Sequence, residues 1–289
     1  MATPKRFMVA QAYARMYGFL KDNLGIHIRG LGFLLRQINQ DHNLLVQGRR
    51  LYFAHRLAEA YARPLYGQWN EPETHALIAC VMDRLMASFV DVGANIGEIM
   101  VDVAAHPSCV QAIGFEPNPA AVEVIKKNIE LNLLSNCSVI CKALGHEKNV
   151  QAMSFGSHSP SASLLLRNSP AGEGVVVEIS TLDSELPALV LGREPIILLV
   201  DVEGYELNVI RGGRAMIGHL KPLIIFEYHR ETQKAFRLAD LQHELGEAYE
   251  IYRVRQDAML DREVDAAWNC VAVPRGSDFE RILRRRILG

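Results

Sequence analysis

A glycine loop and an acidic strand end constrain this chain more than any other feature. An apolar run from Ala87 to Val92 leads into a loop that contains Gly93 and Gly97 and opens a helix. A second apolar run ends at Glu116. Glycine lets the backbone turn tightly and approach a ligand closely, and an acid about 20 residues further on accepts hydrogen bonds from ribose hydroxyls. The pattern predicts a nucleotide-cofactor site at the carboxyl edge of a parallel sheet.

The loop itself indicates which cofactor binds. Enzymes that bind NAD usually carry G-x-G-x-x-G, whereas this loop reads Asp91-x-Gly93-x-Asn95-x-Gly97, without a third glycine to cradle a pyrophosphate. S-adenosylmethionine fits better, because its ammonium and sulfonium suit an acidic strand end and its carboxylate suits amides at a helix start. The predicted cofactor contacts are Asp91, Gly93, Ala94, Asn95, Gly97, Glu116, Asn118, Ala143, Leu144 and Asp201.

Apolar runs and helical patterns alternate through most of the chain. This alternation predicts a doubly wound, Rossmann-like α/β sheet. A loop without a good helical pattern joins the last two runs, which predicts that the final strand is antiparallel. We expect strands at 88–92, 111–116, 137–142, 175–179, 196–201, 223–228, 249–254 and 269–273, and helices at 97–105, 119–133, 205–211 and 231–245.

Three parts follow from this pattern: an N-terminal extension over 1–70, a cofactor domain over 71–275 and a basic tail over 276–289. The extension predicts a helical region over 3–39 and a hairpin over 43–53 that turns near Gln47 and Gly48. We interpret it as a cap on the core or on a second subunit, or as a substrate lid or membrane-contacting element. The tail is expected to be mostly solvated, with contact to an acidic partner or lipid headgroups as the alternative. Asn70 is expected to cap a helix that runs to about residue 86.

Four segments together resemble the FkbM-type methyltransferases. They are Phe89–Gly97, Gly114–Asn118, Leu199–Leu207 with its D-V-E-G-x-E element, and Ile224–His229. The resemblance extends from Glu71 to Pro274. It implies a class I, S-adenosylmethionine-dependent enzyme with a seven-stranded sheet, acting on hydroxyls of sugars, glycolipids or polyketide-type natural products.

A hydroxyl acceptor is a weak acid, so methyl transfer to it needs a positioned base or a metal. His229 and Asp201 are the leading catalytic candidates and Glu203 is the next. Asp201 and Glu203 are also candidate ligands for a divalent cation such as Mg²⁺, a requirement that the sequence leaves undecided. Glu227, Ser161 and Ser163 are candidate substrate contacts. Glu206 and Asp183 are expected to cap helices instead.

Composition narrows the remaining choices. The formal net charge of −2 gives no overall basic field for nucleic acid. Five scattered cysteines do not indicate an oxidising compartment, so a cytoplasmic location is the expectation. No run reaches the roughly 18 apolar residues of a membrane span, although peripheral membrane contact and a homo-oligomer stay open. The alternatives to a methyltransferase are an NAD-linked oxidoreductase and a non-catalytic cofactor-binding assembly module.

Overall fold

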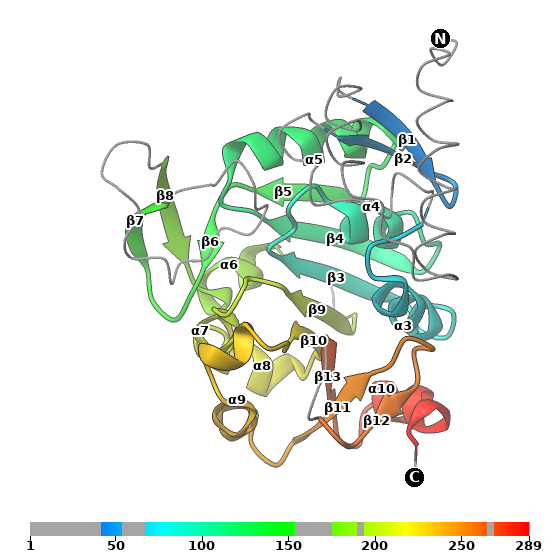
Figure 1. Ribbon diagram of the computed structural model, residues 1–289, viewed down its shortest axis with the longest axis vertical. Coiled ribbons are helices and arrows are strands. Elements are labelled where there is room, and N and C mark those ends of the chain that lie inside the picture. Colours follow the sequence, from blue (N-terminus) through cyan, green and yellow to red (C-terminus); the bar gives the residue numbers. More distant parts are fainter. Residues whose placement is uncertain (1–41, 54–67, 154–174, 190–193, 265–268, 289) are drawn as a thin grey trace, which may run out of the picture.

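A large sheet runs through the middle of the computed structural model, which describes residues 42–53, 68–153, 175–189, 194–264 and 269–288 (Figure 1). Its strand order is β12-β11-β13-β10-β9-β3-β4-β5. The strands are β3 (Ala87–Val92), β4 (Cys109–Phe115), β5 (Cys137–Ile140), β9 (Ile196–Val200), β10 (Leu223–Glu227), β11 (Tyr249–Val254), β12 (Leu260–Asp261) and β13 (Asn269–Pro274).

Strands β5, β4, β3, β9 and β10 are parallel, and β13 is antiparallel to both of its neighbours, β10 and β11. The doubly wound sheet and its antiparallel last strand are therefore confirmed. The expected seven strands are joined by an eighth, because the two-residue β12 pairs with β11 at the edge. Two residues bounded by turns are too short to give a periodic signal.

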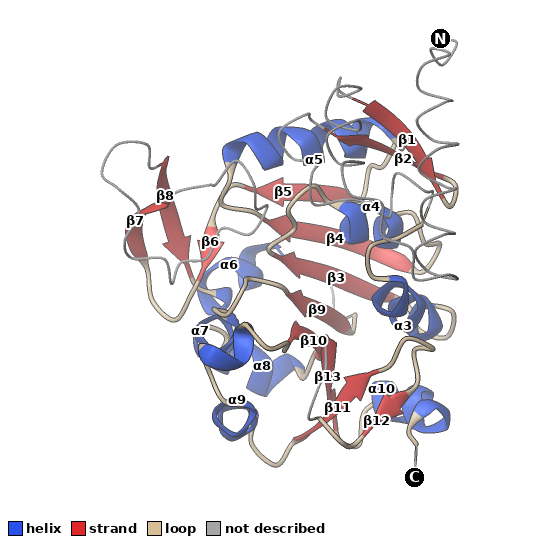
Figure 2. Cartoon of the chain, in the orientation of Figure 1, coloured by secondary structure: helices blue, strands red, loops and turns tan. Residues whose placement is uncertain are grey.

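Helices cover both faces of the sheet (Figure 2). One apolar core joins the face built by Val90, Leu198 and Phe226 to helices α6 to α9, and the other joins the Phe89 face to α3, α4, α5 and α10. No helix among the described residues combines the length and apolar character that a bilayer span requires. The helices are α3 (Pro72–Met82), α4 (Glu98–Ala104), α5 (Pro119–Leu131), α6 (Leu182–Leu189), α7 (Glu206–Arg211), α8 (Arg214–Leu220), α9 (Leu238–Leu245) and α10 (Asp278–Leu283).

The predicted hairpin is present as β1 (His42–Val46) and β2 (Arg49–Phe53). Gln47 and Gly48 form its two-residue turn, both with positive φ, as a tight hairpin turn requires. Asn128 of α5 and Asn132, the C-cap residue of that helix, hold the free edge of β2. Asn132 binds the N–H and C=O of Arg50 at 2.9 and 2.6 Å, and Asn128 accepts from the N–H of Tyr52. The expected helical region over 3–39 lies outside the described residues.

A second, smaller sheet lies on the side toward which the arrowheads of β3 and β4 point (Figure 1). Its order is β6-β8-β7, formed by β6 (Ala143–Leu144), β8 (Val175–Ser180) and β7 (Asn149–Met153). The sequence predicted β8 but not β7, because β7 is mostly exposed and carries few β-branched residues. This sheet places Met153 at the carboxyl rim of the large sheet.

The C-terminal tail differs from the expected solvated segment. It forms α10, whose Phe279 and Leu283 are buried in the core, and the short 3₁₀ helix η4 (Arg284–Arg286). Arg286 donates to the carbonyl of Ala258, and Ile287 forms a bridge to Leu260. Apolar residues three to four apart therefore pack the tail against the core. The arginines of the tail are the reason that the sequence predicted a solvated segment.

Several helix boundaries also differ from expectation, and α3 ends at Met82 instead of near residue 86. The helix expected over 231–245 is split into a 3₁₀ turn, η3 (Thr232–Lys234), and α9. Arg237 is extended between them, and the Tyr228 hydroxyl accepts a hydrogen bond from the first amide of α9. At α3 the N-cap residue is Glu71 rather than Asn70, because Asn70 donates instead to Glu98.

Candidate active site

The glycine loop brings the end of β3 against the end of β9. Gly93 has a φ of +91°, and a Cβ there would lie 1.8 Å from the carbonyl oxygen of Asp201. The Asp201 amide in turn donates to the carbonyl of Val92. Only glycine fits this contact, so Gly93 keeps the two loops together at the rim of the sheet.

Glu116 follows β4 and is held by backbone amides. Its two carboxylate oxygens accept from Asn95 N at 2.9 Å and Asn118 N at 2.8 Å. Burial raises the pKa of Glu116 to about 7, although these two hydrogen bonds act in the opposite direction. The glycine loop and the strand end thus form one unit, with the acid fixed in position.

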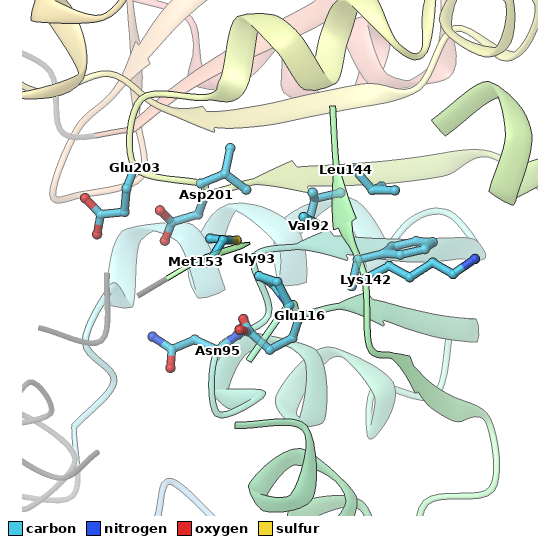
Figure 3. Close-up of a pocket in the computed structure, with 13 residues that line it drawn as sticks. Val92, Gly93, Asn95, Glu116, Lys142, Leu144, Met153, Asp201 and Glu203 are labelled. Carbon is cyan, nitrogen blue, oxygen red and sulfur yellow. The ribbon is translucent and has the colours of Figure 1, made fainter. Parts of the chain in front are cut away.

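A cavity with about 610 Å³ of empty space, including solvent at its open mouth, lies at this rim. Figure 3 shows Asp201 and Glu203 in one part of it and Glu116 and Asn95 in another. Its lining residues are Val92, Gly93, Asn95, Phe115, Glu116, Pro117, Lys142, Ala143, Leu144, Met153, Asp201, Val202 and Glu203.

A second cavity of about 430 Å³ adjoins the first. The two share Gly93, Asn95 and Asp201, so Asp201 stands at their junction. The second cavity is also lined by Asn70, Glu71, Asp91, Ala94, Ile96, Glu98, Ile99 and Leu199.

The described lining is strongly acidic. Its single basic residue is Lys142, whose ammonium is tied to Glu178 at 2.9 Å and Glu185 at 3.0 Å. Burial, followed by the charges of Glu71 and Glu116, raises the pKa of Asp91 to about 8. A cationic ligand would relieve this concentration of carboxyls, whereas a pyrophosphate would add to it.

The D-V-E-G-x-E element forms a braced loop after β9. Glu203 and Gly204 have φ values of +54° and +99°. Buried Glu206 accepts from Val202 N at 3.2 Å and Gly204 N at 3.1 Å through one oxygen. Glu206 therefore holds the loop while Asp201 and Glu203 line the cavity. Its expected role as a helix cap is wrong, because its side chain binds loop amides and α7 has no side-chain cap. Asp183, by contrast, accepts from the first amides of α8.

Asp201 lies beside Glu227 because β9 and β10 are paired in parallel with Val200 opposite Phe226. Burial raises the pKa of Asp201 well above its ordinary value, and the neighbouring carboxyls Glu227, Glu71, Glu203 and Glu206 raise it further. Burial and the charges of Glu203, Glu206 and Glu71 raise the pKa of Glu227 to about 9, against a lowering by its interaction with Asp201. Adjacent buried carboxyls resist carrying two charges at once.

Glu203, Glu227 and His229 each offer a potential metal ligand, all within 4.8 Å of one another. However, the Nδ1 atom of His229 accepts from two backbone amides at 3.2 Å each. In the neutral ring the proton is then on Nε2, which has no lone pair left for an ion. As the ring stands, the histidine is not a ligand and only carboxylates remain as donors. No step of the proposed reaction depends on a divalent cation.

Most predicted cofactor contacts line the two cavities, but two do not. Gly97 begins α4 in a left-handed conformation, and the Asn118 side chain caps α5 by accepting from Ala120 N. Both residues shape the loops without lining either cavity. Ser161 and Ser163 lie outside the described residues. The cavity residues that the sequence did not single out include Asn70, Glu71, Glu98, Lys142 and Met153. Glu71 had a signal, since it stands beside the proline at the start of α3.

Comparison with known proteins finds similar sequences and structures, among them the following three. A curated relative, Methyltransferase 1 of Beauveria bassiana (strain ARSEF 2860), is 28% identical over 141 residues, 43% of this chain and 57% of that protein. The crystal structure of methyltransferase FkbM from Methylobacillus flagellatus KT aligns with a TM-score of 0.44 and 16% identity, over 75% of this chain and 53% of the other. An rRNA methylase of Streptococcus thermophilus aligns at 0.42 with 11% identity, over 71% and 98%. The chain spans just over half the length of the first two.

The sheet order, the glycine loop and the acid after β4 define the Rossmann-like fold of S-adenosylmethionine-dependent methyltransferases. The family described as Methyltransferase FkbM domain matches residues 91–256, more than half of the sequence. The chain therefore belongs to the FkbM methyltransferase family.

Proposed function

We propose that this protein is an S-adenosylmethionine-dependent O-methyltransferase that acts on a hydroxyl of a small molecule, of the sugar, glycolipid or polyketide type. Family membership supports the methyltransferase part of the proposal. The acceptor type rests on the chemistry of the site.

The observation that carries the proposal is the acidic lining of the two joined cavities. Glu116, Asp201 and Glu203 line the first, and Glu71, Asp91 and Glu98 extend the acidic lining into the second. Such a lining suits a cofactor with a sulfonium and an ammonium and disfavours one with a pyrophosphate. Glu116 is placed to accept from ribose hydroxyls, and the apolar Phe115, Leu144 and Met153 suit a purine.

Asp201 suits a hydroxyl acceptor. The cofactor supplies an electrophilic methyl group when it is bound. The acceptor oxygen must lose its proton as it attacks, because a hydroxyl is a weak acid, whereas a neutral amine can attack before it loses one. Asp201, at the junction of the cavities, is the group we assign to receive that proton, and Glu203 lies beside it to orient the acceptor.

Calorimetric titration with S-adenosylhomocysteine tests the cofactor assignment. We expect micromolar binding to the intact protein and a loss of at least tenfold in Glu116→Ala, about 1.4 kcal/mol. Glu123→Ala is the matched control, because Glu123 is an exposed carboxylate on α5 that pairs with Lys126. Binding of NAD, together with no binding of S-adenosylhomocysteine, would indicate an oxidoreductase instead.

A screen of hydroxylated acceptors tests the reaction. Sugars, glycolipids and phenolic polyketides are incubated with methyl-labelled cofactor, and label is sought on the acceptor oxygen. Tight cofactor binding without transfer to any hydroxyl in the screen would contradict the O-methyltransferase proposal and favour the assembly module.

A further inference from the structure

Three polar side chains lie next to one another at the ends of β9 and β10. Asp201 lines the cavities, Glu227 at the end of β10 lies beside it with 6% of its surface exposed, and His229 follows two residues later. Of these three residues, only Asp201 has a role in the methyl transfer proposed for this protein. The other two groups are buried or half-buried at the end of the adjacent strand, where a merely structural residue would be apolar.

The backbone fixes the orientation of His229. Its Nδ1 accepts from Glu231 N and Thr232 N, and the Thr232 hydroxyl donates to the His229 carbonyl at 2.9 Å. Two donors on Nδ1 leave the proton of the neutral ring on Nε2. That atom lies 3.2 Å from Oε1 of Glu227, within hydrogen-bonding distance. His229 is thereby set to donate a hydrogen bond to Glu227, not to remove a proton from a substrate.

Glu227 has one oxygen toward His229 and one without a hydrogen-bond partner. Its Oε2 is buried and finds no partner among the described residues. The carboxyl of Asp201 is the neighbour that interacts with Glu227. A buried oxygen without a partner costs free energy unless a proton is shared there. Packing alone therefore does not explain why Glu227 is buried at this position.

We propose that Glu227 is a positioning residue that shares a proton with Asp201, and that His229 holds Glu227 in place through its Nε2–H. The inference rests on the proposed function and deepens it. It also replaces the earlier hypothesis that His229 is the base, since both ring nitrogens face other groups.

The transfer step conserves atoms and electrons. A lone pair of the acceptor oxygen forms the new C–O bond to the methyl carbon, and the pair of the breaking C–S bond stays on sulfur, which becomes a neutral thioether. The hydroxyl proton moves to Asp201. The Asp201–Glu227 pair therefore carries at most one proton before the transfer and one more proton after it.

The charged groups around the pair favour this use. Asp201 faces Glu227 of β10, Glu71 at the start of α3, Glu203 of the loop and Glu206 of α7, while Glu227 faces the same acids and His229. These carboxyls make the pair more basic than an isolated acid, and the positive cofactor offsets part of that effect.

Carboxyl ¹³C NMR titration of the complex with S-adenosylhomocysteine tests the pairing without any acceptor. Glu227→Gln keeps the shape but removes the neighbouring charge, so the pKa of Asp201 should fall by about one unit or more. His229→Ala removes a donor to Glu227, so the pKa of the pair should rise, whereas His229→Gln keeps a donor and should restore part of the wild-type value. Glu231→Gln is the control, since this exposed side chain pairs with Lys234 and only its backbone contacts His229.

The same variants are then compared in turnover against an acceptor from the screen. Glu227→Gln and His229→Ala should lower kcat at least tenfold with little change in cofactor affinity, and should move the acidic limb of the pH profile in opposite directions. An unchanged Asp201 pKa in Glu227→Gln, in a protein that still methylates, overturns the inference and leaves the proposed function intact. Failure of every acceptor instead removes the proposed function, and the inference with it.

Metal binding is the competing outcome. Mn²⁺ is added alone and followed by electron paramagnetic resonance. Micromolar binding that disappears in Glu227→Gln, together with turnover lost in chelator and restored by Mn²⁺, would overturn the shared-proton arrangement in favour of a cation at this position.

Discussion

Glu116, at the end of β4, and Asp201, at the end of β9, occupy the same rim of the sheet but differ in what surrounds them. Two backbone amides donate to Glu116. Burial raises the pKa of Asp201, and four neighbouring carboxyls raise it further. Fixed donors hold a carboxyl group in one orientation, which suits recognition, whereas crowding by like charges makes a carboxyl more basic, which suits proton transfer. We therefore propose that the two ends of one cavity separate binding from chemistry.

The sharpest test of this division is Asp201→Asn. We expect turnover to fall at least a hundredfold, about the contribution of a general base, while affinity for S-adenosylhomocysteine stays within about threefold. Turnover is measured with labelled methyl groups and affinity by calorimetry. Asp240→Asn serves as control, because Asp240 pairs with Arg237 on the surface. Unchanged turnover in Asp201→Asn would contradict the assignment of proton transfer to Asp201.

The loop that carries Asp201 depends on Glu206. Glu206→Ala leaves the buried amides of Val202 and Gly204 without their acceptor, so we expect a loss of about 1–3 kcal/mol in the free energy of unfolding. Glu206→Gln keeps one acceptor oxygen and should stay close to wild type. Chemical denaturation of both variants measures the difference. Equal losses of unfolding free energy in the two variants would show that the charge of Glu206, rather than its loop hydrogen bonds, stabilises the protein.

The opposite pattern is expected at the other end. Glu116→Gln retains one acceptor oxygen but loses the second, so affinity for S-adenosylhomocysteine should fall by about five- to tenfold. Turnover at saturating cofactor should stay within about twofold, because Glu116 does not touch the transferred proton. A variant with normal affinity and low turnover would reverse the roles of the two carboxyls.

The acidic rim should also make the ligand-free protein less stable at high pH. The folded-state pKa values of Asp91, Glu116 and Glu227 are raised to about 8, 7 and 9. The stability that these protonated groups contribute is fully present below their ordinary pKa values and is lost as the pH rises through the raised ones. We expect Tm to fall by a few degrees between about pH 6 and 9, and Asp91→Asn to flatten that fall. A Tm that rises over this interval would contradict the prediction.

Much of the fold could be predicted because the buried parallel strands are continuous apolar runs and the helices repeat every three to four residues. The hairpin followed from its Gln-Gly turn. Short elements escaped prediction: α8 has seven residues after two glycines, and the side chain of the distant Asp183 caps it. A contact made by a residue far along the chain leaves no local signal.

The site shows the same limit. Residue type and position at a strand end located Asp91, Gly93, Glu116, Asp201 and Glu203, which line the cavities. The sequence alone did not reveal that Asn118 is used as a cap or that both nitrogens of His229 face other groups. Orientation depends on backbone geometry, which residue type does not specify.

Asn128 of α5 and its C-cap residue Asn132 have a consequence for assembly. The outer edge of a two-stranded ribbon ordinarily offers its amides and carbonyls to any further strand. Along β2 the outward-facing groups of Arg50 and Tyr52 are already taken by Asn132 and Asn128, which imitate a neighbouring strand. Another chain that extends this hairpin by strand pairing must therefore approach along β1, and the helix side of the ribbon is closed to it.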